Sequence, residues 1–576
     1  MNMHSDNLHV YTPHDRKSAG KAKRADPITT QVVRYALNAA ANRMKRVLIR
    51  TAFSSPIYEG HDFTVTIYDR QIRLLAQAPT LPLFMGTMSF CVESAVSAAG
   101  GEAALAEGDV ILYNVPYGSG SHAPDVAVVM PVFREGVLVG YAAAKAHLGD
   151  IGAKNPYPSD SIDVFQEGLK LEGVKFFRRG ELVEDVLKII MSNSRLPDLT
   201  KGDLLAVVAC CRAGAEELVR VIDRFGMVTF LDCTERMYEH GETVVRDFIA
   251  RMPDGRYEAF GHLDNDGLSD EPIKFKIALI VERDEVTFDL SEVPDAVRGP
   301  LNSPFPGTVS ACRIALAMLA GNEAPNEGHF RPLRIISRPG SMLHAVSPQP
   351  TFLYGWPLMQ LIEAVYQAVS GARDGRAPSG SAGDFCGVAY FGFDEVRREM
   401  MIAAATPLPV GMGATAEGDG ATLMHLVIAH SRLPSVELLE AKSPFIRLET
   451  WEITPDSAGP GKYRGGLGWK VSYRLQRDAI FMTAIERTKV ASWGQGGGLS
   501  GATNRLILNY PDGRTVPTTK ITDIPLPQGT LTEVYCGGGG GYGSPLERDP
   551  KAVLNDLRLG YITEQKAREH YPHAFA

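Results

Sequence analysis

The chain has 576 residues, a formal net charge of −8 and a hydrophobic content of 44%. This length is too great for one hydrophobic core and predicts several domains, and the acidic balance without a basic stripe argues against a nucleic-acid partner. No apolar run reaches the ~18 residues of a membrane-spanning helix, so we expect no membrane span.

Cysteine usage and the first residues of the chain indicate its compartment. Seven cysteines are scattered without a Cys-x-x-Cys pair, which suggests reduced thiols and a cytoplasmic location. Residues 1–25 are polar and basic and lack the apolar segment of a secretory signal. We expect them to form a flexible leader or an arm that orders against a partner subunit.

Asp26 followed by Pro27 is a typical start for a helix, because aspartate caps free N–H groups and proline fits the first turn. Apolar residues recur at helical spacing from Val33 to Leu48 and predict one long amphipathic helix that ends near Thr51. Its apolar stripe is expected to contact the core or another subunit rather than a ligand.

A turn-rich loop at residues 54–62 ends in His61 and Asp62 and leads into a strand predicted for residues 63–68. Asp62 is therefore the residue immediately before the first residue of the predicted strand. From the pattern alone, a carboxylate in water is favoured over a metal ligand at this position.

Two His-x-x-Asp units, His122/Asp125 and His147/Asp150, lie 25 residues apart. The apolar residues between them predict two strands, 126–133 and 137–144, with a turn that would bring the two histidines to the same end of a sheet. Imidazole and carboxylate groups that converge there suit zinc, manganese or iron(II). Histidines at strand ends are also often plain hydrogen-bonded surface groups, and the pattern leaves both interpretations open.

The remaining elements predict an α+β fold with several domains. Helices are expected at residues 163–169, 182–195, 204–225, 227–251, 306–320 and 358–370, and short strands dominate from residue 257 onward. The expected domains are a metal-bearing α/β domain at 26–254, a central mixed domain at 255–370, and a β-rich domain at 371–576. The last of these ends in two short helices split at Gly560.

Two further motifs have a plain structural interpretation. Asp264-Asn265-Asp266-Gly267 resembles the head of a calcium loop but lacks the later glutamate, so a turn is favoured. The glycine tract at residues 537–541 could cradle a phosphate through its N–H groups, yet no Lys-Ser/Thr follows it, so it is not a P-loop. Close backbone packing is the alternative use of such glycines.

Several motifs in a fixed order carry a resemblance to a known family. They are Arg50-Thr51-Ala52-Phe53-Ser54, Glu59-Gly60-His61-Asp62-Phe63, Gly120-Ser121-His122-Ala123-Pro124-Asp125-Val126, His147-Leu148-Gly149-Asp150-Ile151-Gly152 and Arg464-Gly465-Gly466-Leu467-Gly468. On these motifs the chain, from about Asp26 to Tyr571, resembles the hydantoinase B/5-oxoprolinase family of B-type subunits of ATP-dependent amidohydrolases.

The resemblance implies a site and a partner. The family's metal ligands fall on Asp62, His122, Asp125 and His147, which would bind one divalent metal such as zinc, manganese or iron. We expect the catalytic residues His61 and Asp150 to orient these ligands or to transfer protons. A hydantoinase A-type partner would bind ATP and phosphorylate the substrate in a hetero-oligomer such as α2β2.

Three functions follow from the resemblance. The favoured one is hydrolysis of a cyclic amide such as a hydantoin, a lactam or oxoproline. The second is carboxylation of a ketone of the acetone or acetophenone type with bicarbonate, and the third is a non-catalytic scaffold for the partner. Val115, Ser121 and Ala153 depart from the family pattern beside the predicted metal loop, so the substrate should not be copied from any one relative.

Overall fold

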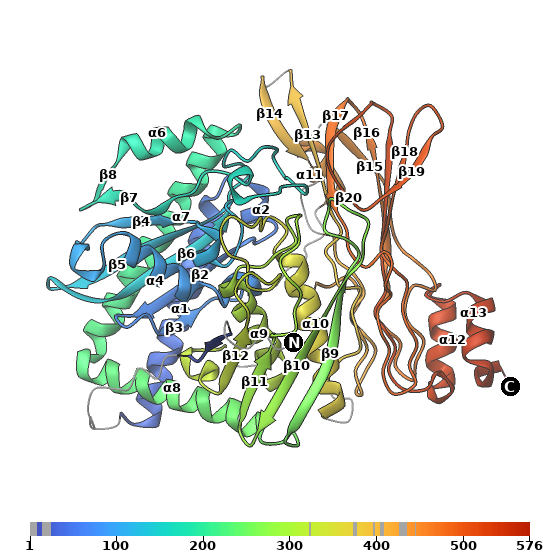
Figure 1. Cartoon of the computed structure of the whole chain (residues 1–576), viewed down its shortest axis with the longest axis horizontal. Coiled ribbons are helices and arrows are strands. Elements are labelled where there is room, and N and C mark those ends of the chain that lie inside the picture. The colour runs from blue at the N-terminus through green and yellow to red at the C-terminus, as the bar shows by residue number, and fades with distance from the viewer. Residues whose placement is uncertain are drawn as a thin grey trace, which may run out of the picture. The chain divides into compact units, whose positions relative to one another are not determined.

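The computed structural model describes residues 8–13, 25–321, 324–372, 377–395, 398–403, 408–425, 435–443 and 445–575. Helices and several β-sheets are combined in it (Figure 1), which confirms the expected α+β, multi-domain class. Across these ranges, no helix combines the length and the apolar character that spanning a membrane requires.

Contacts divide the chain into two compact units. Unit 1 comprises Met1–Pro156, Ser161–Arg256 and Ile277–Leu358, and unit 2 comprises Tyr157–Asp160, Tyr257–Lys276 and Met359–Ala576. Residues 255–370, expected as a central domain, occur in both units: the chain leaves unit 1 at Arg256 and returns to it at Ile277. The three expected domains stay a prediction.

The elements up to residue 372 are mainly those of unit 1. The helices are α1 (Pro27–Thr51), α2 (Ser55–Tyr58), α3 (Pro82–Met85), α4 (Met88–Ala98), α5 (Pro116–Ser119), α6 (Glu184–Ser192), α7 (Pro197–Phe225), α8 (Met227–Ile249), α9 (Phe305–Ala320) and α10 (Gly355–Ala372). The strands are β1 (His9–Tyr11), β2 (Phe63–Asp69), β3 (Leu74–Gln77), β4 (Val110–Tyr113), β5 (Asp125–Arg134), β6 (Val137–His147), β7 (Glu172–Arg178), β8 (Glu181–Leu182), β9 (Gly255–Leu263), β10 (Ile273–Glu282), β11 (Glu285–Asp289) and β12 (Leu333–Ser337).

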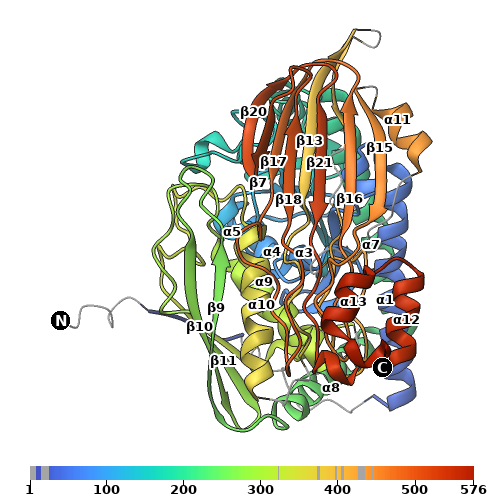
Figure 2. The same ribbon diagram turned by 90° about the vertical axis from the view of Figure 1, so that its right-hand side faces the viewer.

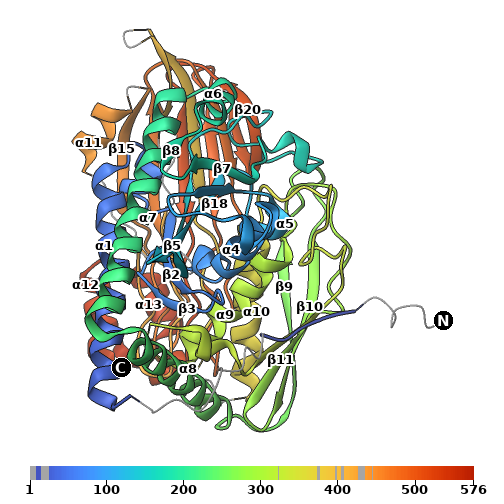
Figure 3. The same ribbon diagram turned by 90° about the vertical axis from the view of Figure 1, so that its left-hand side faces the viewer.

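Helix α1 begins as predicted. The Asp26 carboxylate accepts a hydrogen bond from the N–H of Thr29 at 2.9 Å, and Pro27 occupies the first turn. Its buried stripe includes Val33 and Leu48, and the helix lies beside α7 (Figure 3). The apolar residues that recur at helical spacing in α1 therefore pack in the hydrophobic core.

A seven-stranded sheet in the order β3-β2-β6-β5-β4-β7-β8 is the main sheet of unit 1. Its central strands are apolar on both faces. On β5, Val126 and Val128 belong to a core shared with α7, whereas Ala127 and Val129 belong to one shared with α4. Because successive side chains point to opposite faces, this assignment shows that helices cover the sheet on both sides.

Strands β5 and β6 form the predicted hairpin. Its turn holds Glu135 and Gly136 at φ values of 51° and 77°. The antiparallel register places Asp125 opposite His147, so each strand extends a little further than predicted and ends on a candidate site residue.

The segment predicted as a helix at residues 163–169 contains only the short 3-10 helix η2 (Val164–Gln166). Asp163 accepts hydrogen bonds from the N–H groups of Phe165 and Gln166 at 2.9 and 3.2 Å, which caps the turn. Gly168 at a φ of 124° stops it, because this left-handed region does not continue a helix. Strand β7, which follows, was not predicted.

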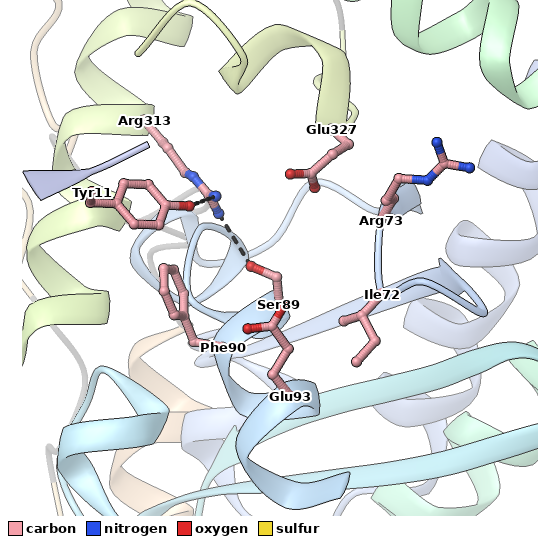
Figure 4. Close-up of a pocket in the computed structure, with 8 residues that line it drawn as sticks. All are labelled: Tyr11, Ile72, Arg73, Ser89, Phe90, Glu93, Arg313 and Glu327. Atoms are coloured by element: carbon pink, nitrogen blue, oxygen red, sulfur yellow. Dashed lines mark hydrogen bonds between the residues drawn. The ribbon is translucent and has the colours of Figure 1, made fainter. Parts of the chain in front are cut away.

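Within the predicted leader, residues 8–13 are described and include β1, which pairs antiparallel with β12. The Tyr11 hydroxyl accepts a hydrogen bond from Arg313 at 2.9 Å beside a small cavity that Glu93 and Glu327 also line (Figure 4). Residues 1–7 and 14–24 lie outside the described residues. A role of the leader as an arm for a partner subunit stays a prediction.

Unit 2 contains two further sheets, in the orders β15-β16-β21-β18-β19 and β14-β13-β17-β20. Figure 2 shows their strands lying side by side, with α12 and α13 below them. Gly560, at a φ of 71°, separates these two helices as predicted. The bounds are β13 (Gly387–Asp394), β14 (Glu399–Ala403), α11 (Val436–Lys442), β15 (Ile446–Ile453), β16 (Trp469–Leu475), β17 (Ala479–Ala484), β18 (Arg505–Asn509), β19 (Thr515–Thr518), β20 (Lys520–Leu526), β21 (Leu531–Cys536), α12 (Pro550–Arg558) and α13 (Glu564–His570).

The glycine tract after β21 is packed against other backbone segments. All five of its N–H groups donate within the chain, to Asn504 Oδ1 and to the carbonyl oxygens of Ala502, Gly466, Gly380 and Leu499. Successive N–H groups thus bond to different segments, and none is left to cradle a phosphate. We name residues 537–541 and the segments they bond to the glycine bundle.

The Asp264-Asn265-Asp266-Gly267 motif is a turn, as predicted. Asp266 Oδ1 accepts from the N–H groups of Leu268 and Ser269 at 3.0 and 2.8 Å. Asp264 Oδ2 accepts from the N–H and the hydroxyl of Thr488, each at 2.7 Å. These oxygens are used by protein donors rather than grouped around a cation.

Beneath this turn lies a buried network of charged groups. Lys520 Nζ contacts Glu486 Oε1 at 2.6 Å, with both side chains at most 1% exposed. Asp384 accepts from the N–H groups of Glu486 and Phe385, each at 2.7 Å. Burial raises the pKa of Asp384 to about 8 against the lowering effect of these hydrogen bonds, so the folded state holds a proton that the unfolded chain releases near pH 4.

Replacing Gly539 by alanine should destabilise unit 2 strongly. The added Cβ would lie 1.9 Å from the carbonyl oxygen of Met412, and backbone cannot move aside as a side chain can. We expect a loss of about 3 kcal/mol or more, measured as a lower melting temperature. Gly418→Ala is the matched control, because nothing lies within 4 Å of its Cβ position. Equal melting temperatures for the two variants would contradict the packing described.

Because the pKa of Asp384 is raised in the folded state, its contribution to the free energy of unfolding should fall as the pH rises. Below pH 4 both states are protonated, and between pH 4 and 8 only the unfolded state loses the proton, so stability declines by up to roughly 1.4 kcal/mol per pH unit. Asp384→Asn should therefore show a smaller drop in melting temperature from pH 5 to pH 8 than the wild type. Asp512→Asn, at an exposed turn, should keep the wild-type slope, and an unchanged slope in Asp384→Asn would refute the assignment.

Candidate metal centre

Three side chains converge where the β5–β6 hairpin closes. His122 follows the α5 turn, Asp125 is the first residue of β5, and His147 is the last residue of β6. His122 Nε2 lies 3.0 Å from His147 Nδ1 and 3.1 Å from Asp125 Oδ1, and the last two atoms lie 2.9 Å apart. Among the described residues, this is the one group of His, Cys, Asp and Glu side chains arranged to hold a metal ion.

The tautomer of His122 follows from its second nitrogen. Nδ1 lies 2.7 Å from the carbonyl oxygen of Phe352, and a carbonyl can only accept, so Nδ1 carries the hydrogen. When the ring is neutral, Nε2 then presents a lone pair to the other two side chains. A hydrogen bond of this kind is how proteins fix a metal-binding imidazole.

Asp125 is oriented in the same manner. The Tyr354 hydroxyl donates to Asp125 Oδ2 at 3.2 Å, so Oδ1 is the oxygen left to face the histidines. Asp125 is completely buried. Burial works to raise the pKa of this carboxyl, but the charges and hydrogen bonds of His122 and His147 outweigh it and hold the pKa below its usual value.

The spacing of these atoms fits a shared cation. Three lone pairs about 3 Å apart repel one another unless a proton or a cation lies between them. Donors about 2.1 Å from one divalent ion, and at right angles to each other, are about 3.0 Å apart. Two imidazoles and one carboxylate on one side of a metal, with positions left open, are an established ligand set.

Asp62 lies close to this group but outside the set of converging atoms. Its backbone carbonyl accepts from the N–H of His147 at 3.0 Å. Burial raises the pKa of its carboxyl to about 6, with His147 and Asp125 acting in opposite directions. The structure thus gathers His122, Asp125 and His147, and the fourth predicted ligand stands next to them.

The two predicted catalytic residues have different surroundings. His61 is buried and adopts a φ of 52° in the turn before β2. Asp150 is committed to Arg195, whose guanidinium lies 2.6 Å from Oδ1 and whose N–H also donates to the carboxylate. Asp150 therefore anchors the loop after β6, and the roles assigned to His61 and Asp150 stay predictions.

Lys145 was not identified from the sequence. It is fully buried on β6, two residues before His147, and its ammonium donates to Thr87 Oγ1, the Ser119 carbonyl and Ser121 Oγ at 2.6, 3.0 and 3.2 Å. Ser121 is one of the positions that depart from the family pattern, and here it joins Lys145 to the loop that carries His122. A lysine inside the run Ala142–Ala146 is the signal that could have revealed it.

Comparison with known proteins gives consistent matches. The family model described as hydantoinase B/oxoprolinase matches residues 26–545. A protein of Pseudomonas sp. (strain NS671), provisionally named as the B-type subunit of a D-/L-hydantoinase, is 30% identical over 95% of each chain.

Two solved structures have the same fold. The chain matches the ATP-dependent caprolactamase of Pseudomonas jessenii with a TM-score of 0.88 and 26% identity, over 95% of this chain and 96% of that one. It matches a nucleotide-free acetone carboxylase with a TM-score of 0.85 and 19% identity, over 95% of this chain and 79% of that one. The second likeness, at this identity, concerns the fold alone.

Proposed function

The chain belongs to the hydantoinase B/oxoprolinase family, and from this premise we propose that it is the metal-binding B-type subunit of a heteromeric, ATP-dependent cyclic amide hydrolase. Its substrate would be a hydantoin, a lactam or oxoproline phosphorylated by an A-type partner. The observation that carries the proposal is the convergence of His122, Asp125 and His147.

In this proposal each side chain has a defined task. His122, Asp125 and His147 hold a divalent metal, with Asp62 as the neighbouring fourth ligand. The metal, when bound, lowers the pKa of water and polarises a substrate oxygen. His61 and Asp150 position the loops on which the ligands lie. Phosphorylation of the amide oxygen makes the ring carbon more electrophilic, so that water can add to it. The C–N bond then breaks, the nitrogen takes up a proton and leaves as the amine, and the acyl phosphate that remains is hydrolysed by a second water to the acid and phosphate.

ATP is assigned to the partner. No P-loop motif occurs in the sequence, and the N–H groups of the glycine bundle are engaged with the chain itself. The hydantoinase relative is named as one subunit of its enzyme, and the caprolactamase is described as ATP-dependent. These descriptions support a division of labour between two kinds of subunit.

A ketone carboxylase that uses bicarbonate is the alternative. It rests on the likeness to acetone carboxylase, which at 19% identity carries the fold only, whereas the matches at higher identity are to proteins named for cyclic amides. Labelled bicarbonate separates the two, since only a carboxylase incorporates the label into a stable acid. A non-catalytic scaffold, the third function, would hold no stoichiometric metal.

Removing a ligand should remove metal and activity together. In His122→Ala and His147→Ala we expect metal per chain, measured by atomic emission, to fall close to zero. ATP-coupled turnover by the reconstituted complex should drop at least about 100-fold, because the loss of one imidazole from the proposed ligand set weakens the hold on a divalent ion. His240→Ala, an exposed histidine on α8, is the control. Full turnover by a metal-free variant would end the proposal.

The purified chain alone should not bind ATP. Equilibrium dialysis with labelled ATP should show no saturable binding to the isolated chain and saturable binding to the reconstituted complex, because the proposal assigns the nucleotide to the partner. Tight stoichiometric binding by the isolated chain would overturn the division of labour while leaving the metal assignment intact.

A further inference from the structure

One short segment, residues 351–354, holds two of the three converging side chains. The Phe352 carbonyl accepts from His122 Nδ1 at 2.7 Å, and the Tyr354 hydroxyl donates to Asp125 at 3.2 Å. The rings of both residues also pack on the His122 imidazole, with centroids 4.7 and 5.3 Å away. The orientation of the candidate metal centre therefore depends on how this segment is fixed.

The segment is fixed by the carboxylate of Glu167. Its Oε1 accepts from the N–H groups of Thr351 and Phe352 at 2.7 and 2.9 Å, and its Oε2 accepts from the Thr351 hydroxyl at 3.1 Å. The Ser161 hydroxyl donates to the same carboxylate at 2.8 Å. The Glu167 side chain, which lies in the turn after η2, thus accepts hydrogen bonds from two consecutive N–H groups and two hydroxyls.

We propose that Glu167 is a positioning residue for the metal centre, and this inference rests on the proposed function. By holding the N–H groups of Thr351 and Phe352, Glu167 turns the Phe352 carbonyl toward His122. That carbonyl keeps the hydrogen on Nδ1 and the lone pair on Nε2. The chain of contacts runs from Glu167 through the peptide of Phe352 to a metal ligand.

The energetics of this arrangement indicate a role beyond packing. Glu167 is completely buried, and no lysine or arginine of the described chain lies within salt-bridge distance of it. Burial raises the pKa of this carboxyl to about 7, against the hydrogen bonds from Ser161, Thr351 and Phe352 and the attraction of Lys170. An apolar residue would fill the volume with less desolvation, but it would leave the two N–H groups without acceptors. The peptide that carries the Phe352 carbonyl would then be held, apart from its contact with His122, by the bond from the Leu353 N–H to the Pro300 carbonyl.

Glu167→Gln tests this directly, because the amide keeps the size but cannot accept on both ends. With Co²⁺ alone as the probe, the variant should bind about 10- to 100-fold more weakly than wild type, as expected for loss of an orienting group. The visible absorption of bound Co²⁺ should also change, since it reports ligand geometry. Glu172→Gln, an exposed glutamate on β7, should bind Co²⁺ as wild type does.

A second measurement uses the full chain without metal. Selective ¹⁵N labelling of histidine should show His122 with its hydrogen on Nδ1 in wild type and as a mixture of tautomers in Glu167→Gln. A single unchanged tautomer, or Co²⁺ affinity within twofold of wild type, would overturn the proposal. Wild type that binds no Co²⁺ would defeat the proposed function, and the tautomer would still decide the role of Glu167.

If Glu167→Gln does not fold, two milder variants replace it. Thr351→Val and Ser161→Ala each remove one hydroxyl donor and leave the backbone N–H groups bonded to the carboxylate. Each should weaken Co²⁺ binding by a few-fold at an unchanged melting temperature. Wild-type affinity in both variants would count against the proposal.

Discussion

The candidate site depends on the register of one hairpin. Because Asp125 faces His147 across β5 and β6, the carboxylate and the imidazole lie side by side, and the preceding turn adds His122. A slip of one residue would move every side chain of a strand to the opposite face. In a hairpin the turn fixes the register, and here the two-residue turn at Glu135 and Gly136, with the irregular pairing between Val132 and Phe133, sets it. The turn at one end of the hairpin thus sets the geometry of the polar site at the other end.

Three ionisable side chains, Lys145, Glu167 and Asp125, are buried around this site. Lys145 is satisfied by neutral oxygens, Glu167 by N–H and O–H donors, and Asp125 by histidines and a tyrosine. Each group costs desolvation energy, which bonds of fixed direction offset. The three together restrain the loop before β5, the end of β6 and the segment before α10. Rigid surroundings are what a metal ligand set requires.

Sequence patterns predicted the features that interactions between residues close in the chain determine. The cap at Asp26, the hairpin between Asp125 and His147 and the split at Gly560 all follow from short-range signals. The groups that orient the His122 and Asp125 side chains could not be predicted in this way. Phe352 acts through its carbonyl, which any residue possesses, and Glu167 acts on residues 184 positions away. The pattern around Asp62 favoured a solvated carboxylate until its motif was matched to a family, because burial leaves no mark in the sequence of a loop.

The glycine bundle of unit 2 has a thermodynamic consequence. Its interior consists of peptide groups in contact, with no room for side chains, so unfolding it exposes mainly polar surface. Polar surface lowers the heat capacity of unfolding, whereas apolar surface raises it. Stabilisation from this region should hold its strength in the cold, where the burial of apolar side chains becomes less favourable. Two kinds of interior with opposite temperature responses are thereby joined in one polypeptide.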